Sequence, residues 1–507
     1  MSNKIIKSTA VILGCSVMAK ILSFIWEAIL AAYLGVSDQA DAIHMTTSIF
    51  NILYPVLDTG IWKVFLPIYQ TKLVQDTNEE AHKFANIALT FFTCLSIAFM
   101  LFLIFFAQPI TMLFAPGFSA EKKAMTAQFL MWSAPRYLFM ASASVVGAML
   151  QCHGRFLGSQ MREIGTHLSR IICVVLCYRY LGIYAAILAF VIGGVFRLLM
   201  QLPFINWQWQ FRPNTYFRNA DMQQMFKRLP AVAASSAISH INGLVDKIIA
   251  SGTVSGAVSC LNYGHKLMNV FSGMISTAIG TATYPTMVQH IAAKQTDKLR
   301  ELLTNTIQVL SFIIIPVSFF CILFSRELVT VAFQRGAFDA SATQLTAAIF
   351  AAYSTEMLFT GIAPTISNVF FGHGDSRTSL YLSILSISLN IIFNFWFCRL
   401  WGVVGLAIAT SLSAAICFFV RLILLRKYLT LDYKSIVKEL VKILLISSIA
   451  IGGAFALLAC FGIANVFARV LCGMLCSVAV YLILAKLFRI STMVLAISMI
   501  RKKLNRR

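Results

Sequence analysis

Several ionisable side chains lie inside long apolar runs of this sequence, where a charge is costly. Lys20 and Glu27 lie two helical turns apart in the first run, and His265 and Lys266 lie in a later one. A charged residue at mid-membrane costs about 2.5–3.5 kcal/mol on insertion scales, so such residues are rare unless they face a polar cavity. A cavity with excess cations suits a phosphorylated substrate. Lys20, Glu27 and Lys266 are therefore candidate substrate-binding residues.

A second group of ionisable residues has two interpretations. Asp58 and Lys63 belong to the second apolar run, and Asp246 and Lys247 to a run in the middle of the chain. These side chains either line the same cavity or, for Asp58, Lys63 and Lys247, lie near the ends of their runs and extend to the lipid headgroups.

Oxygen-bearing side chains form another candidate site. Asn390 and Asn394 are spaced i and i+4, Thr410 lies in the next run, and Asp246 can approach from an earlier one. A hard cation such as sodium prefers oxygens of this kind. Hydrogen bonds between helices explain the same residues equally well. The sequence thus offers a candidate cation site and a purely structural alternative.

The composition identifies the solvent of the elements that carry these residues. Hydrophobic residues make up 59% of the 507 and charged residues 12%, with a mean hydropathy of +0.80. A soluble domain carries roughly 25% charged residues. Apolar runs of about 20 residues recur along the chain, as a hydrocarbon core of about 30 Å requires of a helix. The bilayer is therefore the expected solvent.

Three function classes are disfavoured. The net charge of +22 comes from basic residues at the ends of apolar runs, which indicates membrane topology and not nucleic-acid binding. The 12 cysteines are scattered without a metal-binding spacing. No phosphate-binding loop of the GxxxxGK[ST] type occurs, so ATP hydrolysis is not expected. We expect no cofactor other than a coupling sodium ion.

The predicted fold is an all-α polytopic membrane protein with about 14 transmembrane helices. The predicted spans are 8–34, 42–70, 85–108, 124–152, 158–177, 181–204, 229–251, 255–290, 302–325, 341–371, 378–398, 401–426, 437–460 and 464–488. Alternating the loops between the two sides gathers most Lys and Arg on the side of the N-terminus, which predicts that both termini are cytoplasmic.

An internal repeat organises these spans. Phe118 precedes His153-Gly154 by 35 residues, and Phe338 precedes His373-Gly374 by the same 35. Each half is broken in the middle, at Ala134-Pro135 in the first and at Tyr353-Ser354 in the second. Transporters often consist of duplicated halves. The predicted parts are an N-terminal lobe (1–204), a cytoplasmic linker (205–228), a C-terminal lobe (229–426), two final helices (437–488) and a basic tail (489–507).

Three stretches resemble the MurJ (MviN-type) family, which flips the lipid-linked peptidoglycan precursor lipid II. They are AKILSFIWEAILAAYLGVSDQADAIHMTTSIFNIL (19–53), VDKIIASGTVSGAVSCLNYGHKLMNVFSGMISTAIGTATYPTMVQ (245–289) and FQRGAFDASAT (333–343). The resemblance implies two six-helix lobes around a cationic cavity and two final helices that form a groove for the lipid tail. It also implies a monomer in the bacterial cytoplasmic membrane whose partners are lipid II and membrane lipids.

The resemblance also assigns roles to individual residues. Lys20 and Lys266 stand at positions of family arginines, Glu27 at that of an acidic residue, and Asp41 matches the acidic residue after the first span. A sodium site of the family resembles the set Asp246, Asn390, Asn394 and Thr410. At the position of Asn394, the family frequently has an acidic residue.

Two positions depart from the family pattern. Trp26 replaces one arginine, and Tyr54 or a neighbour replaces another, so this cavity is expected to be less cationic. Both aromatic rings either stack on a sugar or simply pack.

The expected function is a transporter, not an enzyme, that flips lipid II by alternating access. The alternatives are a flippase for another polyprenyl-linked glycan and a drug/cation antiporter of the same superfamily, the multidrug, oligosaccharidyl-lipid and polysaccharide exporters. A polyprenyl-phosphate enzyme would need clustered acidic or His residues at one membrane face, and the sequence has no such cluster.

Overall fold

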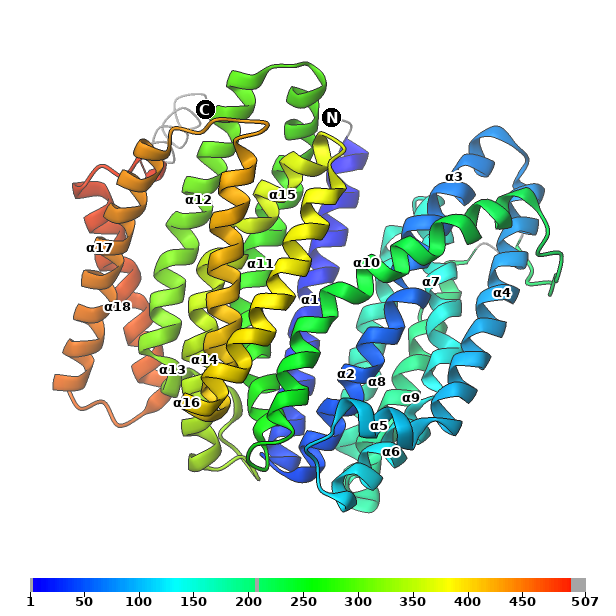
Figure 1. Ribbon diagram of the computed structural model, residues 1–507, viewed down its shortest axis with the longest axis horizontal. Coiled ribbons are helices and arrows are strands. Elements are labelled where there is room, and N and C mark those ends of the chain that lie inside the picture. The colour runs from blue at the N-terminus through cyan, green and yellow to red at the C-terminus, as the bar shows by residue number, and fades with distance from the viewer. Residues whose placement is uncertain (1–2, 206–208, 494–507) are drawn as a thin grey trace. The chain divides into compact units, whose positions relative to one another are not determined.

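The computed structural model describes residues 3–205 and 209–493, and all regular structure in these ranges is helical (Figure 1). The predicted all-α fold is confirmed. The chain divides by its contacts into two compact units, residues 1–259 and 260–507. The last residues of the predicted basic tail, from 494 onward, lie outside the described residues.

The first unit contains ten α-helices, one π-helix and one 3₁₀-helix within the described residues. They are α1 (Asn3–Leu34), α2 (Asp38–Leu57), the π-helix η1 (Ile61–Phe65), α3 (Leu66–Gln75), α4 (Asn78–Phe105), α5 (Ala107–Phe114), α6 (Ala120–Ser133), α7 (Arg136–Cys152), α8 (Phe156–Leu181), α9 (Tyr184–Leu199), the 3₁₀-helix η2 (Leu202–Phe204) and α10 (Ala220–Ala250). Helix α7 packs against α4, α8 and α9, and α1 packs against α8. The contact boundary falls after the predicted linker because α10 packs against α2.

The second unit holds the remaining helices. They are α11, which begins in the last residues of the first unit (Ala257–Ala292), α12 (Thr296–Leu323), α13 (Ser325–Phe333), α14 (Ala340–Thr360), α15 (Ala363–Gly372), α16 (Ser376–Leu425), α17 (Tyr433–Cys460) and α18 (Val466–Leu487). Helix α14 packs against α12 and α16, and α17 packs against α12 and α18.

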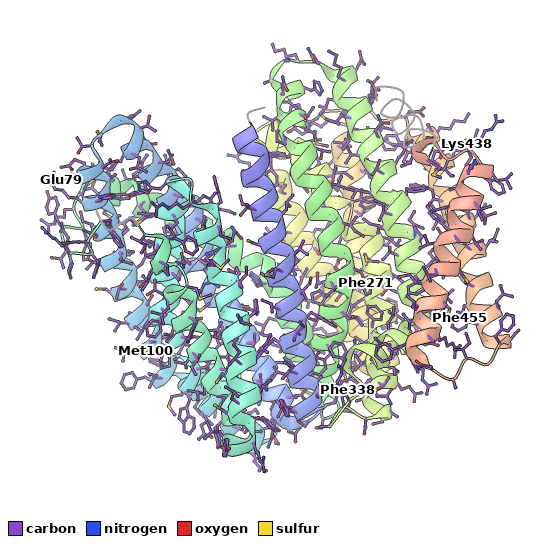
Figure 2. All side chains as sticks on the ribbon, turned by 180° about the vertical axis from the view of Figure 1, so that it is seen from behind. Glu79, Met100, Phe271, Phe338, Lys438 and Phe455 are labelled. Carbon is purple, nitrogen blue, oxygen red and sulfur yellow. The ribbon has the colours of Figure 1, made fainter. Side chains whose placement is uncertain are left out.

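The helix surfaces are those of a membrane protein. Large apolar side chains are exposed along the helices, for example Phe105 at 76% and Ile483 at 66%, whereas soluble proteins rarely expose large contiguous apolar patches. On α4, for example, Glu79 lies in the first turn and the apolar Met100 lies further along the helix (Figure 2). Lipid is the solvent that these surfaces fit.

Among the described residues, nine helical segments are long and apolar enough to cross a membrane. Two predicted spans, 378–398 and 401–426, merge into one of them, α16. The polar helices α2, α10 and α11 are not among the nine. The count of fourteen spans therefore stays a prediction.

The two halves repeat the same turn at the predicted His-Gly pairs. Gly154 and Gly374 have φ of +73° and +74°, a left-handed conformation that favours glycine. In each case the histidine before the glycine is the C-cap of the preceding helix, α7 or α15. The equal spacing read from the sequence therefore corresponds to equal geometry.

A second pair of glycines extends the repeat. Gly182 ends α8 with φ 54° and ψ −134°, and Gly402 interrupts α16 with φ 58° and ψ −139°. Helix α16 is therefore two helices joined at Gly402, which together match α8 and α9. This match explains why two spans were predicted in 378–426.

One predicted break is wrong. The first half breaks at Ala134 and Pro135, between α6 and α7, as predicted. The second half breaks instead between Thr360 and Ala363, and α14 continues through Tyr353-Ser354. Serine and tyrosine can continue a helix, whereas Pro364 in the first turn of α15 has no N–H to donate to the preceding turn and so ends α14 near Thr360.

Candidate functional site

The most completely bonded candidate is Asp41, in the first turn of α2. Its side chain is 1% exposed. One carboxylate oxygen accepts the backbone N–H of Ser259 at 2.7 Å and its hydroxyl at 2.6 Å, and the other accepts the N–H of Gly256 at 2.8 Å. These donors belong to the start of α11, whose first N–H groups have no partner within the helix. Asp41 thus caps α11 from another helix, where the helix dipole also favours a negative charge.

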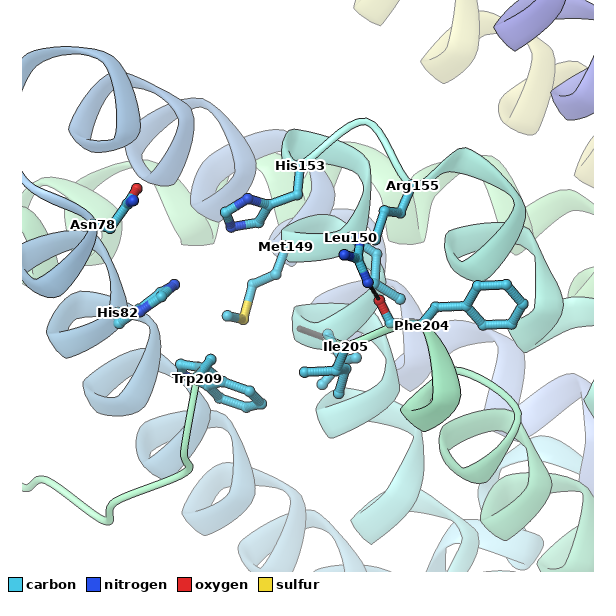
Figure 3. A pocket seen from close by; sticks show the side chains of 10 residues that line it. Asn78, His82, Met149, Leu150, His153, Arg155, Phe204, Ile205 and Trp209 are labelled. Atoms are coloured by element: carbon cyan, nitrogen blue, oxygen red, sulfur yellow. Dashed lines mark hydrogen bonds between the residues drawn. The ribbon is translucent and has the colours of Figure 1, made fainter. Parts of the chain in front are cut away.

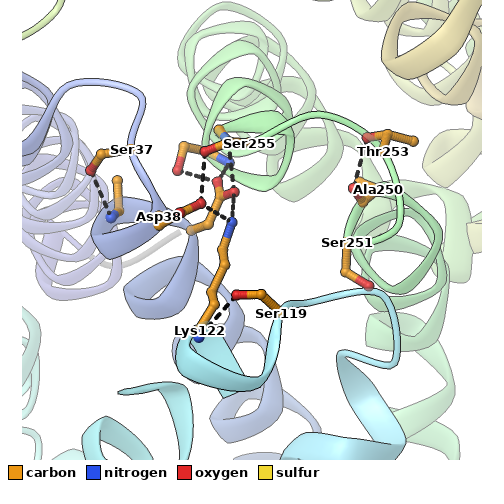
Figure 4. Close-up of polar contacts among 12 residues, drawn as sticks. Ser37, Asp38, Ser119, Lys122, Ala250, Ser251, Thr253 and Ser255 are labelled. Atoms are coloured by element: carbon orange, nitrogen blue, oxygen red, sulfur yellow. Dashed lines mark hydrogen bonds and ion pairs between the residues drawn. The ribbon is translucent and has the colours of Figure 1, made fainter. Parts of the chain in front are cut away.

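Lys122 of α6 completes this cluster. Its ammonium group lies 2.6 Å from Asp41 and 2.7 Å from Asp38, and also 4.3 Å from the centre of the Phe118 ring (Figure 4). Asp38 accepts a further hydrogen bond from Ser255 at 2.7 Å. The hydrogen bonds from Lys122 and Ser255 lower the pKa of Asp38. One lysine therefore bridges two carboxylates that bind the turn before α11.

Close backbone packing positions the cluster. A Cβ on Gly117 would lie 2.3 Å from the Cα of Gly252, so only glycine permits this approach of the loop before α6 to the turn after α10. The Gly117 N–H also donates to the Ser251 hydroxyl at 3.2 Å. The turn that precedes α11 is therefore held by backbone contact as well as by charge.

Glu27 and Trp26 of α1 are buried in the first unit. The Glu27 carboxylate lies 4.0 Å from the His44 ring. Trp26 is 3% exposed and packs edge-on against Phe190 in a hydrophobic cluster, with the Arg170 guanidinium 5.9 Å from its ring. Of the two interpretations of Trp26, packing is therefore the one that the structure supports. The Tyr54 side chain lies outside the described residues.

Buried arginines supply positive charge near Trp26. The guanidinium of Arg170, from α8, lies 4.9 Å from the Phe190 ring, and that of Arg136, from α7, lies 5.2 Å from the same ring. Both side chains are less than 9% exposed. Although Trp26 replaces a family arginine, cations from neighbouring helices occupy its surroundings.

A second buried charge network surrounds Asp58, at the junction of α2 and η1. Its carboxylate accepts hydrogen bonds from Arg162 at 2.8 Å and Ser144 at 2.5 Å. Arg197 pairs with Glu163 at 2.7 Å and lies 3.6 Å from Asp58. The interpretation of Asp58 as a residue that extends to the headgroups is wrong, because its carboxylate is ion-paired inside the helical bundle.

Contacts of Arg162 with Asp58 and Trp62 pack the π-helical segment η1 against α8. Trp62 of η1 lies under the Arg162 guanidinium at 4.4 Å. π-Helical turns occur frequently at functional sites. Arg162 therefore holds both ends of the junction, through Asp58 and through Trp62.

We expect Asp58→Asn to lower the free energy of unfolding by about 3–5 kcal/mol, the usual effect of removing one partner of a buried ion pair. Thermal unfolding of the purified protein in detergent measures this loss. Asp76→Asn is the control, because Asp76 is an exposed carboxylate that pairs with Lys72 on the surface, where a pair contributes about 0–1 kcal/mol. Equal losses in both variants would contradict a stabilising role for the ion pair between Asp58 and Arg162.

The predicted cationic residues belong to different units. Lys20 is half-buried on α1 in the first unit, and Lys266 is half-buried on α11 in the second. Asp246, on α10, is 3% exposed, and the neighbouring Lys247 donates to the Ser48 hydroxyl at 2.8 Å. Lys247 thus bonds to α2 within the first unit, and its extension to the headgroups stays a prediction.

Three of the four predicted cation-binding residues come together in α16. The side-chain N–H of Asn394 donates to the side-chain oxygen of Asn390 at 3.0 Å, and the side-chain N–H of Asn390 donates to the Thr410 hydroxyl at 3.0 Å. Both asparagines are fully buried. The Gly402 kink brings Thr410 back beside Asn390. Asp246 belongs to the other unit.

Sequence reasoning missed several buried charges in the first unit. The buried ones are Lys122, Arg136, Arg170 and Arg197, and the half-buried Arg162 and Glu163 pair with them or with Asp58. All but Lys122 and Arg136 lie inside the predicted spans 158–177 and 181–204, where any ionisable residue signals a polar contact. That signal was available in the sequence.

Comparisons with known proteins cover most of the chain. The family model described as lipid II flippase MurJ matches residues 30–471. A probable lipid II flippase MurJ of Borreliella burgdorferi is 27% identical over 446 residues, covering 87% of both chains. One of Vibrio cholerae is 23% identical over 440 residues, covering 82% of this chain and 81% of the relative.

Solved structures show the same fold. A structure described as lipid II flippase MurJ in an inward closed conformation has a TM-score of 0.80 and 22% identity, covering 94% of this chain and 97% of that one. An inward-facing multidrug resistance transporter of the MATE family and MOP superfamily has a TM-score of 0.69 and 13% identity, covering 80% of this chain and 94% of that one. At these identities, both likenesses describe the fold alone.

Proposed function

The chain belongs to the lipid II flippase MurJ family, and we propose that it moves lipid II from the inner to the outer leaflet of the bacterial cytoplasmic membrane. The observation that carries this proposal is the family match over residues 30–471, which includes most of both units. The chain is a multi-pass membrane transporter. We further propose that it has no enzymatic activity, acts as a monomer without nucleic acid, and keeps both termini in the cytoplasm.

The substrate headgroup combines a pyrophosphate with sugars, so cations are needed to bind it. We assign this role to Lys20 and Lys266, with Glu27 and Asp41 as acidic residues that position the surrounding helices. Lysine binds phosphate as a point charge and lacks the bidentate fork of arginine. Lys20 and Lys266 are half-buried in helices of an apolar chain, where an ionisable residue commonly marks a substrate pathway.

Alternating access then carries the headgroup across the membrane while the polyprenyl chain stays in lipid beside α17 and α18. An anionic headgroup that moves outward gains roughly 2.3 kcal/mol per charge for each 100 mV of inside-negative potential. The membrane potential, a sodium gradient or both can therefore drive the transport.

Two other substrates fit the same fold. The likeness to MATE transporters suggests a drug/cation antiporter as one alternative, which would need an acidic, aromatic cavity for cationic drugs. The other alternative is a flippase for another polyprenyl-linked glycan, whose phosphate would bind the same lysines as lipid II. A transport assay distinguishes these substrates.

Depletion complementation tests the proposed function. A bacterium depleted of its own lipid II flippase receives this chain, and lipid II in the outer leaflet is measured along with growth. We expect both to be restored. Failure to restore either, although the protein is inserted in the membrane at a normal level, would contradict the lipid II assignment and favour another lipid-linked glycan.

We also propose that Asn390, Asn394, Thr410 and Asp246 contribute oxygens to a sodium ion. The chain of hydrogen bonds from Asn394 through Asn390 to Thr410 supports this proposal because it gathers three such side chains at one place in α16. The side-chain amide of Asn can turn by about 180° so that its oxygen, instead of its nitrogen, faces a cation.

Sodium is expected to raise the thermal unfolding temperature of the purified protein more than potassium at equal ionic strength. A ligand at 100 times its Kd stabilises the folded state by about 2.7 kcal/mol. Asn390→Ala should abolish the sodium-specific increase, whereas Ser383→Ala, an exposed position of the same helix, should retain it. An identical response to both cations would leave hydrogen bonding between helices as the role of these residues.

A further inference from the structure

A cavity of about 210 Å³ lies in the first unit, between the start of α4, the end of α7 and the segment that follows η2. Figure 3 shows His82 and Asn78 from α4 on one side, and Met149 and His153 from α7 with Arg155 from the next turn on the other. Trp209 closes the cavity below His82. None of the residues assigned to lipid II or sodium above lines it.

The polar lining of this cavity is basic. The His82 and His153 rings lie 6.2 Å apart, and the His153 ring is held by the Tyr69 hydroxyl at 3.1 Å. Arg155 donates from one terminal nitrogen to the Phe204 carbonyl at 2.5 Å. Among the described residues, no acidic side chain lines the cavity. Burial, followed by the charge of Arg155, lowers the pKa of His153, and an anion bound beside Arg155 would favour the protonated imidazole.

The nearby acidic residues are already paired. Glu79 and Glu80 lie in the first turn of α4, and both contact the exposed Lys83 at 3.5 Å and 2.9 Å. Neither lines the cavity. They therefore do not neutralise Arg155.

The internal repeat provides a comparison for Arg155. The matching residue in the second unit, one position after Gly374, is Asp375. Asp375 caps α16 by accepting the Thr378 N–H at 3.0 Å, and it also accepts the Tyr428 hydroxyl at 2.7 Å. The second unit thus uses this position for helix capping.

Arg155 does not perform this capping role. It occupies the N-cap position of α8 without a side-chain capping hydrogen bond, although Asp, Asn, Ser or Thr at an N-cap usually contributes about 1 kcal/mol. The equivalent positions of the two units thus hold an acid that caps a helix, Asp375, and a base that lines a cavity, Arg155. A local departure of this kind is expected where a residue serves a function.

We propose that this cavity binds a phosphate-bearing group, with Arg155, His82 and His153 holding the phosphate and Trp209 and Met149 packing against the apolar part of the ligand. Arginine donates charge-assisted hydrogen bonds to phosphate oxygens, and each imidazole ring can donate an N–H hydrogen bond to them. The indole and thioether surfaces suit a glycerol or sugar moiety attached to it.

Two sources can supply such a group. The loops after α3, α7 and η2 that surround the cavity are all predicted to lie on the cytoplasmic side, so both an anionic lipid headgroup of the inner leaflet and a soluble phosphate ester can reach it. The site is separate from Lys20 and Lys266, so its failure and that of the flippase proposal are distinguishable.

Chemical modification of histidine tests this proposal directly. The full-length protein in zwitterionic nanodiscs is treated with diethyl pyrocarbonate, and modification of His82 and His153 is followed by mass spectrometry. In one arm glycerol 1-phosphate or inorganic phosphate is titrated against chloride at equal ionic strength. In the other arm the nanodiscs contain phosphatidylglycerol. His290 in the second unit serves as the internal reference.

We expect at least one phosphate-bearing probe to slow modification of both cavity histidines several-fold and to leave His290 unchanged. Protection by the soluble probes identifies a phosphate ester as the ligand, and protection only in phosphatidylglycerol discs identifies a lipid headgroup. Absence of protection in both arms would overturn the proposal.

The variant Arg155→Gln should weaken protection at least about tenfold, as loss of a charged hydrogen bond predicts. Lys83→Gln is the matched control, because it removes a positive charge from an exposed residue next to His82 that does not line the cavity. Equal weakening by both variants would also overturn the proposal, since only the general surface charge would then matter. Arg155→Lys should bind with intermediate strength.

Discussion

Replacing Lys20 and Lys266 together by glutamine is expected to reduce lipid II flipping by at least about a hundredfold. A hydrogen bond to a charged group contributes about 1.5–3 kcal/mol, which is roughly a factor of 10 to 100 for each lysine. Glutamine keeps the length and polarity of the side chain but removes the charge that binds pyrophosphate. The measurement is the initial rate of lipid II externalisation at equal protein levels.

Two controls give this experiment its meaning. Lys298→Gln removes an exposed lysine from the start of α12 and should leave the rate unchanged. Arginine at positions 20 and 266 should retain transport, because its planar fork matches phosphate better than lysine does. Normal flipping by the double glutamine variant would contradict the assigned roles and favour a substrate without phosphate.

Asp41→Asn is expected to cause a large loss of stability in the first unit. Asp41 accepts four hydrogen bonds and is buried with Lys122. Removing one partner of a buried ion pair costs about 3–5 kcal/mol, because the other charge stays buried. Thermal unfolding in detergent should therefore begin at a markedly lower temperature than in the unmodified protein.

The neighbouring carboxylate is the matched control. Asp38 contacts the same Lys122 ammonium but its side chain is 55% exposed, so Asp38→Asn should cost no more than about 1 kcal/mol. The double variant Asp41→Asn with Lys122→Met should recover part of the loss, since it removes the buried ammonium that would otherwise keep only the exposed Asp38 as a charged partner. A loss for Asp41→Asn no greater than that for Asp38→Asn would show that capping of α11 contributes little.

The sequence predicts much of this fold because the bilayer imposes simple rules. Apolar runs of sufficient length mark helices, and the equal spacing of two His-Gly pairs corresponds to equal turns at Gly154 and Gly374. The break in the second half does not follow from Tyr353-Ser354, because those residues tolerate helix and the break lies at Pro364 in the first turn of α15.

The candidate site was less predictable. Asp41 was identified through the family resemblance, yet its partner Lys122 lies 81 residues away in sequence, and no local pattern joins them. Asp58 looked like an interfacial residue because its partner Arg162 comes from another helix. Tertiary pairing of this kind appears only when helices are packed, although the ionisable residues of α8 and α9 indicated that such pairing must exist.

The most direct test of the account is a transport assay with purified components. The protein is reconstituted in liposomes that contain fluorescent lipid II in the inner leaflet, and a membrane-impermeant quencher reports its appearance in the outer leaflet. We predict transfer by the unmodified protein and none above protein-free liposomes by the Lys20→Gln, Lys266→Gln variant. Transfer of lipid II at the same rate by both proteins, or by neither when insertion and folding are intact, would contradict the account.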